Sequence, residues 1–242
     1  MIKRYIYRVL KMSTVSAVLI FRRFTTKRLK AFSLVELAIA LVIIGLLIGG
    51  VLKGQELLES ARLKTIITQL NQYRLATNTF VDRYGALPGD YDKASSYLKA
   101  GLKDGNNNGI IEGFGLSSSG GAASHEALSF WEHLAAAELL PNNTPPTTKL
   151  GGVVTIAHAP LDGMQGHWFI IGSANGNKND ASLLTPLQCL TIAKKLDTED
   201  PFSGNVQMRN GVQKGKGGQC LKDNKILNTA TKDPACVLYV KL

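Results

Sequence analysis

Two hydrophobic patterns follow one another along residues 32–84. Residues 32–52 are almost all Leu, Ile, Val, Ala and Gly, with a single carboxylate, Glu36. As a helix this stretch is about 31 Å long, enough to cross the hydrocarbon core of a bilayer. In residues 53–84 the large side chains recur at alternating spacings of three and four, the period of one helix face: Leu63, Ile66, Leu70, Tyr73, Thr77, Phe80 and Tyr84.

We therefore expect one long helix with a transmembrane half, 32–52, and an amphipathic half, 53–84. Gly85 and Pro88 are turn residues that end it at or before Tyr84. The glycines between residues 45 and 54 leave a break in the helix as an open alternative, because glycine is a poor helix former.

Residues 85–242 mix helical and strand patterns and are expected to form an α+β head. Apolar faces at helical spacing predict helices over 124–140 and 182–196. Short apolar runs at 153–157, 167–171 and 236–242 favour strands. The rest of 85–149 is rich in turn residues and is predicted to be mostly loop.

The positive charge of the chain is concentrated before the apolar stretch. Residues 1–31 hold nine of the 28 basic residues and no acid, which leaves 19 basic against 18 acidic residues in the remainder. This is the positive-inside pattern of a cytoplasmic leader, with Met12 as an alternative start, and not a phosphate-binding surface. No direct contact with nucleic acid is expected.

Glu36 is the candidate functional residue of the apolar stretch. An ionisable group at membrane depth is costly and marks a functional site by default. The alternative is a simple signal anchor in which Glu36 reaches the interface. No small-residue cleavage site follows the stretch at Val51–Gln55, so we expect it to be retained as an anchor.

The segment Lys30–Leu37 resembles the type III signal of type IV prepilins and type II secretion pseudopilins. The resemblance implies that prepilin peptidase removes residues 1–31 by cutting between Ala31 and Phe32, and that the new Phe32 amine is methylated. Glu36 then occupies the family's fifth mature position. Two positions depart from the pattern: Ala31 replaces the usual Gly before the cut, and Lys53 replaces a common proline.

The resemblance extends to the head, where 84–90 (YGALPGD) and parts of 184–242 are similar to pilin-like proteins. It implies a pilin-like α+β fold, in which the long N-terminal helix packs on a mixed head, 85–242, with an antiparallel sheet. Pilins tie down a C-terminal loop, and a Cys220–Cys236 disulfide is the pairing we favour, with Cys189 as a buried thiol. The other two pairings stay open.

Residues 104–112 (DGNNNGIIE) are similar to the first part of a calcium-binding loop. The candidate ligands are Asp104, Asn106, Asn108, Ile110 through its carbonyl, and Glu112. Gly115 stands where the bidentate Glu of such a loop belongs, so a plain Asn–Gly turn is the alternative. His125 and His133 are interpreted as surface or packing residues. Glu199–Asp200 is interpreted as a solvated loop, with a second cation site as the alternative.

No catalytic motif occurs in the sequence, and an enzyme is not expected. The prediction is a structural subunit of a type IV pilus or type II secretion-like pseudopilus, polymerised through its N-terminal helix. Its expected partners are prepilin peptidase, other pilin or pseudopilin subunits and an inner-membrane assembly platform. We expect a single-pass inner-membrane protein with a periplasmic head. The alternative is a singly anchored periplasmic binding or sensor protein, and an anchored enzyme is the third reading.

Overall fold

The computed structural model describes residues 33–113, 115–116, 125–176, 178–197, 200–212, 219–223 and 226–242. Two compact units divide the chain between Val51 and Leu52, and each is described by itself. The leader and the predicted cleavage residues Ala31 and Phe32 lie outside the described residues.

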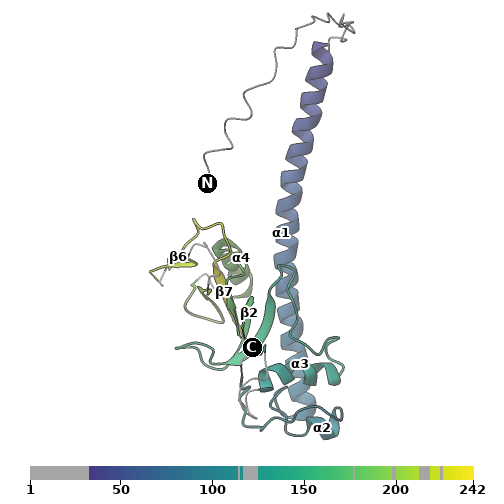
Figure 1. The fold of residues 1–242 in the computed structure, drawn as a ribbon, viewed down its shortest axis with the longest axis vertical. Coiled ribbons are helices and arrows are strands. Elements are labelled where there is room, and N and C mark those ends of the chain that lie inside the picture. Colours follow the sequence, from purple (N-terminus) through teal and green to yellow (C-terminus); the bar gives the residue numbers. More distant parts are fainter. Residues whose placement is uncertain are drawn as a thin grey trace, which may run out of the picture. The chain divides into compact units, whose positions relative to one another are not determined.

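Helix α1 runs from Leu34 to Tyr84 without a break at its glycines (Figure 1). It ends where Gly85 adopts a φ of +71°, a left-handed conformation that glycine adopts at little cost. The predicted amphipathic face is confirmed, because the buried residues of α1 all lie on it: Leu63, Ile66, Leu70, Tyr73, Ala76, Thr77 and Phe80.

The described part of the head contains a five-stranded antiparallel sheet and a two-stranded hairpin. The larger sheet is ordered β1 (Val153–His158), β2 (His167–Asn175), β7 (Cys236–Lys241) and β4 (Val206–Asn210), with β3 (Lys178–Ala181) paired to β2. The hairpin joins β5 (Leu221–Lys222) to β6 (Ile226–Leu227). The chain's last strand, β7, therefore lies inside the sheet, and the predicted α+β fold with an antiparallel sheet is confirmed.

Aromatic side chains form the centre of the core. Tyr73 of α1 meets Trp131 of α3 (Glu126–Ala136) edge to face, with ring centroids 5.2 Å apart. Phe130 and Trp131 both contact Phe169 of β2. This cluster joins the helices to the sheet, and edge-to-face pairs of this kind contribute about 0.5–1.5 kcal/mol beyond their buried area.

The helices of the head are shorter than predicted. Helix α3 covers 126–136 and not 124–140, and beyond it Glu138 has a φ of +59°, which ends the helical path. Its buried face includes Phe130, while Leu128 is only half-buried. A further short helix, α2 (Ala94–Tyr97), was not predicted.

Helix α4 covers Pro186–Leu196 and begins four residues later than the predicted 182. The reason is a capping box, in which Thr185 Oγ1 accepts from Gln188 N–H and the Gln188 side chain accepts from Thr185 N–H. Pro186 suits the first helical position because it has no N–H to satisfy. Leu184 instead pairs with Cys236 of β7, and Leu187 is exposed and not part of the buried face.

Candidate functional site

Ser33 sets the start of α1 and the position of Glu36. The Ser33 carbonyl accepts from Leu37 N–H at 3.1 Å, and its hydroxyl accepts from Val35 N–H at 3.3 Å. Glu36 is the third helical residue, exposed and in the first turn. A carboxylate here is favourable beside the positive end of the helix dipole, and Ser-x-x-Glu is a capping-box sequence. The capping role of Ser33 was not predicted, although this motif indicated it.

The first unit exposes an apolar helix surface. Its large aliphatic side chains from Leu34 onward are exposed, and by length and composition α1 contains a stretch able to cross a membrane. A Cβ added at Gly45, Gly49 or Gly50, or at Gly54 just beyond this unit, would meet nothing within 4 Å. Within the described chain these glycines therefore fill no packing need, and their four-residue spacings are those that allow close helix–helix approach in membranes.

The 104–112 loop is held by carboxylates from outside it. Asp90 accepts from the backbone N–H groups of Asn108 and Gly109, at 3.1 and 2.8 Å. Glu126 of α3 accepts from those of Asn106 and Glu112, at 3.1 and 3.0 Å. Both acids are buried, and burial raises the pKa of Glu126 against the opposing effect of these hydrogen bonds. Neither residue was predicted from the sequence.

The predicted calcium ligands have protein partners in this arrangement. Asp104 accepts from the backbone N–H and hydroxyl of Ser95, both at 2.7 Å, and these bonds hold its pKa below the usual value. The Asn106 and Asn108 amide oxygens each accept from the backbone N–H two residues on. Such Asx turns are what the Asn–Gly alternative implies.

Two predicted ligands remain, Glu112 and Ile110. Glu112 accepts from the Asn108 side-chain amide at 3.2 Å, and Ile110 lies between these two residues in the sequence. Among the described residues, no three His, Cys, Asp or Glu side chains form a group able to hold a metal ion. The calcium site stays a prediction.

His133 packs in the core and hydrogen-bonds to the backbone of two separate segments. Its Nδ1 accepts from Gly89 N–H and its Nε2 donates to the Lys103 carbonyl, both at 2.9 Å. Burial lowers the pKa of His133, which agrees with a neutral ring that accepts at one nitrogen and donates at the other. A Cβ at Gly89 would lie 2.3 Å from the Glu126 carbonyl oxygen, so this turn of the YGALPGD segment requires glycine.

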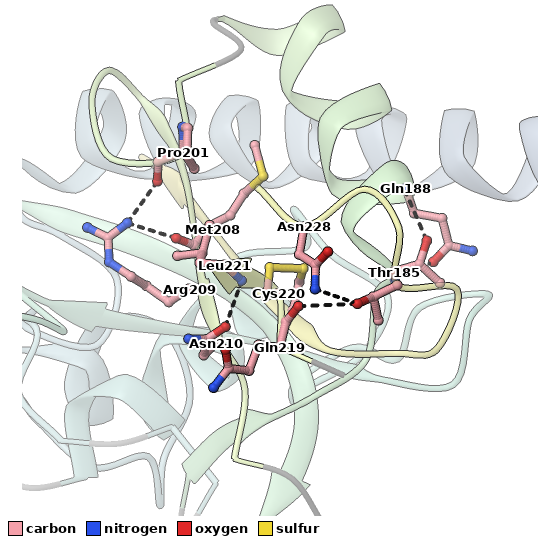
Figure 2. The surroundings of a disulfide bond; sticks show 12 residues. Thr185, Gln188, Pro201, Met208, Arg209, Asn210, Gln219, Cys220, Leu221 and Asn228 are labelled. Carbon is pink, nitrogen blue, oxygen red and sulfur yellow. Dashed lines mark hydrogen bonds between the residues drawn. A yellow bond between two sulfur atoms is a disulfide. The ribbon is translucent and has the colours of Figure 1, made fainter. Parts of the chain in front are cut away.

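A Cys220–Cys236 disulfide joins the hairpin region to β7, as favoured from the sequence (Figure 2). Beside it, the Asn210 side chain of β4 accepts from Leu221 N–H at 2.9 Å. This bond is a second attachment of the hairpin region to the large sheet. Cys189 is a buried free thiol in α4. Of the predicted acidic pair, Asp200 caps Phe202 N–H and the Ser203 hydroxyl; Glu199 lies outside the described residues.

Residues 26–52 match the prokaryotic N-terminal methylation motif, which is the prepilin signal of type IV pilins and pseudopilins. No curated protein and no solved structure matches the chain. The chain thus carries the signal of a pilin-like substrate of prepilin peptidase, on the helix that Ser33 and Glu36 begin. Pilin-like proteins with this motif are structural subunits that assemble with other subunits, and together with the apolar helix the motif indicates membrane anchoring.

Proposed function

We propose that this protein is a filament subunit of a type IV pilus or type II secretion-like pseudopilus. Prepilin peptidase cuts between Ala31 and Phe32, the Phe32 amine is methylated, and the mature subunit waits in the inner membrane with its head in the periplasm. An assembly platform then moves it into a polymer whose centre is made of packed α1 helices.

The observation that carries the proposal is the placement of Glu36. It lies within the methylation motif at 26–52, is the fifth residue after the proposed cut, and is in the first turn of a helix whose neighbouring side chains are exposed aliphatics. Inside lipid or a helix bundle that carboxylate needs a cation. The amine of Phe32 from a neighbouring subunit is the partner we assign to it, and such a pair fixes axial register even where its net stabilisation is small.

The glycines support the same assembly. The pairs Gly45–Gly49 and Gly50–Gly54 are each spaced by four residues, and apart from the helix's own backbone no described residue lies within 4 Å of a Cβ added to them. Contacts between subunits account for them, because small residues let helix backbones approach closely where no water-driven association operates.

The test is Glu36→Gln, assayed by processing, membrane residence and recovery in sheared filaments. Gln removes the charge but keeps the capping capacity of the third helical position. Glu56→Gln is the matched control, since Glu56 lies in the same helix and its ion pair among the described residues is with Lys53 at an exposed surface.

We expect Glu36→Gln to be cut and membrane-resident but nearly absent from filaments, because breaking a buried pair costs about 3–5 kcal/mol. The Glu56→Gln variant should assemble normally. Normal incorporation of Glu36→Gln would show that Glu36 is not the register contact and would favour a subunit at the filament tip or a simple anchored protein.

A further inference from the structure

Ser33 is the residue just before α1, and its side chain takes one of the free backbone donors of that helix. The Ser33 hydroxyl accepts from Val35 N–H at 3.3 Å, and the Ser33 carbonyl accepts from Leu37 N–H at 3.1 Å. The helix itself begins at Leu34. This is the bonding of an N-cap, which satisfies a donor that the first turn of a helix cannot pair internally.

The donor that Ser33 holds is the one that a longer helix would use on the proposed cleavage site. In an α-helix each N–H donates to the carbonyl four residues earlier, so in a continued helix Val35 N–H would donate to the carbonyl of Ala31. That carbonyl belongs to the peptide bond between Ala31 and Phe32, the bond proposed to be cut. The Ser33 hydroxyl and the scissile carbonyl therefore compete for one N–H group.

The sequence before the cut favours a longer helix. Residues 27–31 (KRLKA) contain neither Gly nor Pro, and Lys, Arg, Leu and Ala are all strong helix formers. Adding residues to an existing helix avoids the cost of nucleation, which makes such a stretch a ready extension of α1. The cap at Ser33 opposes that extension, because it ties Val35 N–H to a side chain.

A peptidase must reach the carbonyl carbon of the bond that it cuts, and cleavage of a folded segment follows the population of its open form. The cut is the hydrolysis of the Ala31–Phe32 peptide bond by one water, which leaves a carboxyl on Ala31 and an amine on Phe32. We propose that Ser33 is a positioning residue for this cleavage: its hydroxyl ends the helix at the second residue after the cut and keeps the Ala31 carbonyl available to the peptidase. The inference rests on the proposed function, because the cut belongs to it.

The test is cleavage of the purified full chain in detergent by a purified prepilin peptidase, with initial rates measured over a range of substrate concentrations. Ser33→Ala removes the cap. We expect its KM to rise about fivefold, because the loss of a Ser cap is worth about 1 kcal/mol and a substrate held in a non-binding form binds more weakly in proportion. The kcat should stay unchanged, since the form that binds is the same in both proteins.

Two further variants separate the helix cap from direct recognition of the hydroxyl. Ser33→Asn puts an amide in place of the hydroxyl, and because Asn caps helices as well as Ser, its KM should stay at the natural value. In a chain that already carries Ala31→Gly, Ser33→Ala should change KM much less, because glycine at the cut disfavours a continued helix by itself. Thr68→Ala is the matched control: it removes an exposed hydroxyl that bonds to the Lys64 carbonyl within the same helix, and KM should not change.

Extension of the helix is also measurable by NMR in the uncut chain. In the same detergent without peptidase, the Cα chemical shifts of Ala31 and Phe32 should move towards helical values in Ser33→Ala and stay in place in Ser33→Asn. This readout follows the backbone directly and does not depend on the peptidase.

An unchanged KM in Ser33→Ala would overturn the inference. A KM of Ser33→Asn as high as that of Ser33→Ala would overturn it as well, by showing that the peptidase recognises the hydroxyl itself, and a lower kcat at unchanged KM would place Ser33 in the chemical step instead. All three results leave the filament proposal standing, because the natural chain is cut in each. A natural chain that the peptidase does not cut would overturn both.

Discussion

Arg74 of α1 donates two hydrogen bonds, from Nε and Nη2, to the backbone carbonyl of Lys241 in β7, the Nε bond being 3.1 Å long. The two residues are 167 positions apart. Burial lowers the pKa of Arg74, with the charge of Asp197 acting in the opposite direction. The contact fastens the last strand of the sheet to the amphipathic half of the helix.

Arg74→Met keeps much of the aliphatic stem and removes the donors. We expect the free energy of unfolding of the head to fall by about 2 kcal/mol, since a hydrogen bond from a charged group contributes about 1.5–3 kcal/mol. For a domain of this size that lowers Tm by roughly 4–8 °C. Arg83→Met, on an exposed position of the same helix, is the control; an equal loss in both variants would contradict a specific role for the Lys241 contact.

The cysteines give a prediction that is read as a thiol count. With Cys220 and Cys236 bridged and Cys189 buried, an alkylating reagent should label no thiol in the native protein. Burial raises the pKa of Cys189, which also suppresses its reactivity. Mass spectrometry should find one label after denaturation and three after denaturation with reduction. Labelling of native Cys189 would show that α4 is not packed as described.

The same bridge has a stability consequence. It closes a loop with a sequence separation of 16, for which chain-entropy arguments give about 3 kcal/mol. Cys220→Ala with Cys236→Ala should therefore lower Tm, and a reducing agent should leave the Tm of that variant unchanged. A reductant that lowers the Tm of both proteins equally would rule out the disulfide as the cause.

Local patterns in the sequence were enough to predict the elements that carry their own signal. The buried face of α1 follows from helical spacing, and β1, β2 and β7 follow from apolar runs between turn residues. The start of α4 was predicted wrongly although Thr185 and Gln188 form a capping-box sequence, because the apolar Leu183 and Leu184 extended the helical pattern. Strand β4 (VQMRN) alternates apolar and polar residues over its first four positions and was missed although that signal was present.

The residues of the candidate site also differ in whether a local sequence pattern identifies them. Glu36 was identified from its place in an apolar stretch, and nothing within the 104–112 loop pointed to Asp90 or Glu126. Those acids lie in a turn and a helix 14 to 20 positions away from the N–H groups they bind. Contacts of this kind depend on tertiary packing, which single-sequence periodicity does not report.

The environment of His167 leads us to expect that the stability of the head falls in acid. Its Nε2 accepts from Ile111 N–H at 3.0 Å, which requires a neutral ring, and burial followed by the nearby His158 lowers its pKa from 6.5 to about 4. Between those values the unfolded chain binds more protons than the native protein. Stability should therefore fall as pH drops from about 6.5 towards 4.

His167→Gln tests this cause, because Gln offers an acceptor to Ile111 N–H and does not titrate. Urea unfolding across that pH range should show a smaller pH slope for the variant, and the lowered pKa of His133 should supply part of the remaining slope. An unchanged pH dependence of the unfolding free energy would show that His167 is not a cause of the acid sensitivity.

The calcium prediction for residues 104–112 is tested by thermal unfolding. If the loop binds the ion, millimolar calcium should raise Tm, since a ligand of the folded state alone stabilises it by mass action. Asp104→Asn should abolish that rise; its bond to Ser95 means that the baseline Tm can change, so the quantity compared is the shift with calcium. An unchanged melting curve would leave the Asn–Gly turn as the full description.

The leader region determines whether the central proposal holds. The proposed cleavage between Ala31 and Phe32 would generate the amine that Glu36 is proposed to meet, and Ala31 stands where the prepilin signal usually has glycine. Ala31→Gly should preserve or quicken processing, and Ala31→Arg should stop it, because the peptidase site would have to accept a bulky charge. Both substitutions lie outside the described residues and change no residue of the head, so we expect folding not to confuse the result.

The most direct measurement is the mass of the N-terminal peptide of the membrane-bound protein from cells that contain prepilin peptidase. We expect a chain that begins at Phe32 and carries one methyl group on its amine, in agreement with the methylation motif at 26–52. An intact leader in both the natural protein and the Ala31→Gly variant would contradict the account of this chain as a processed filament subunit.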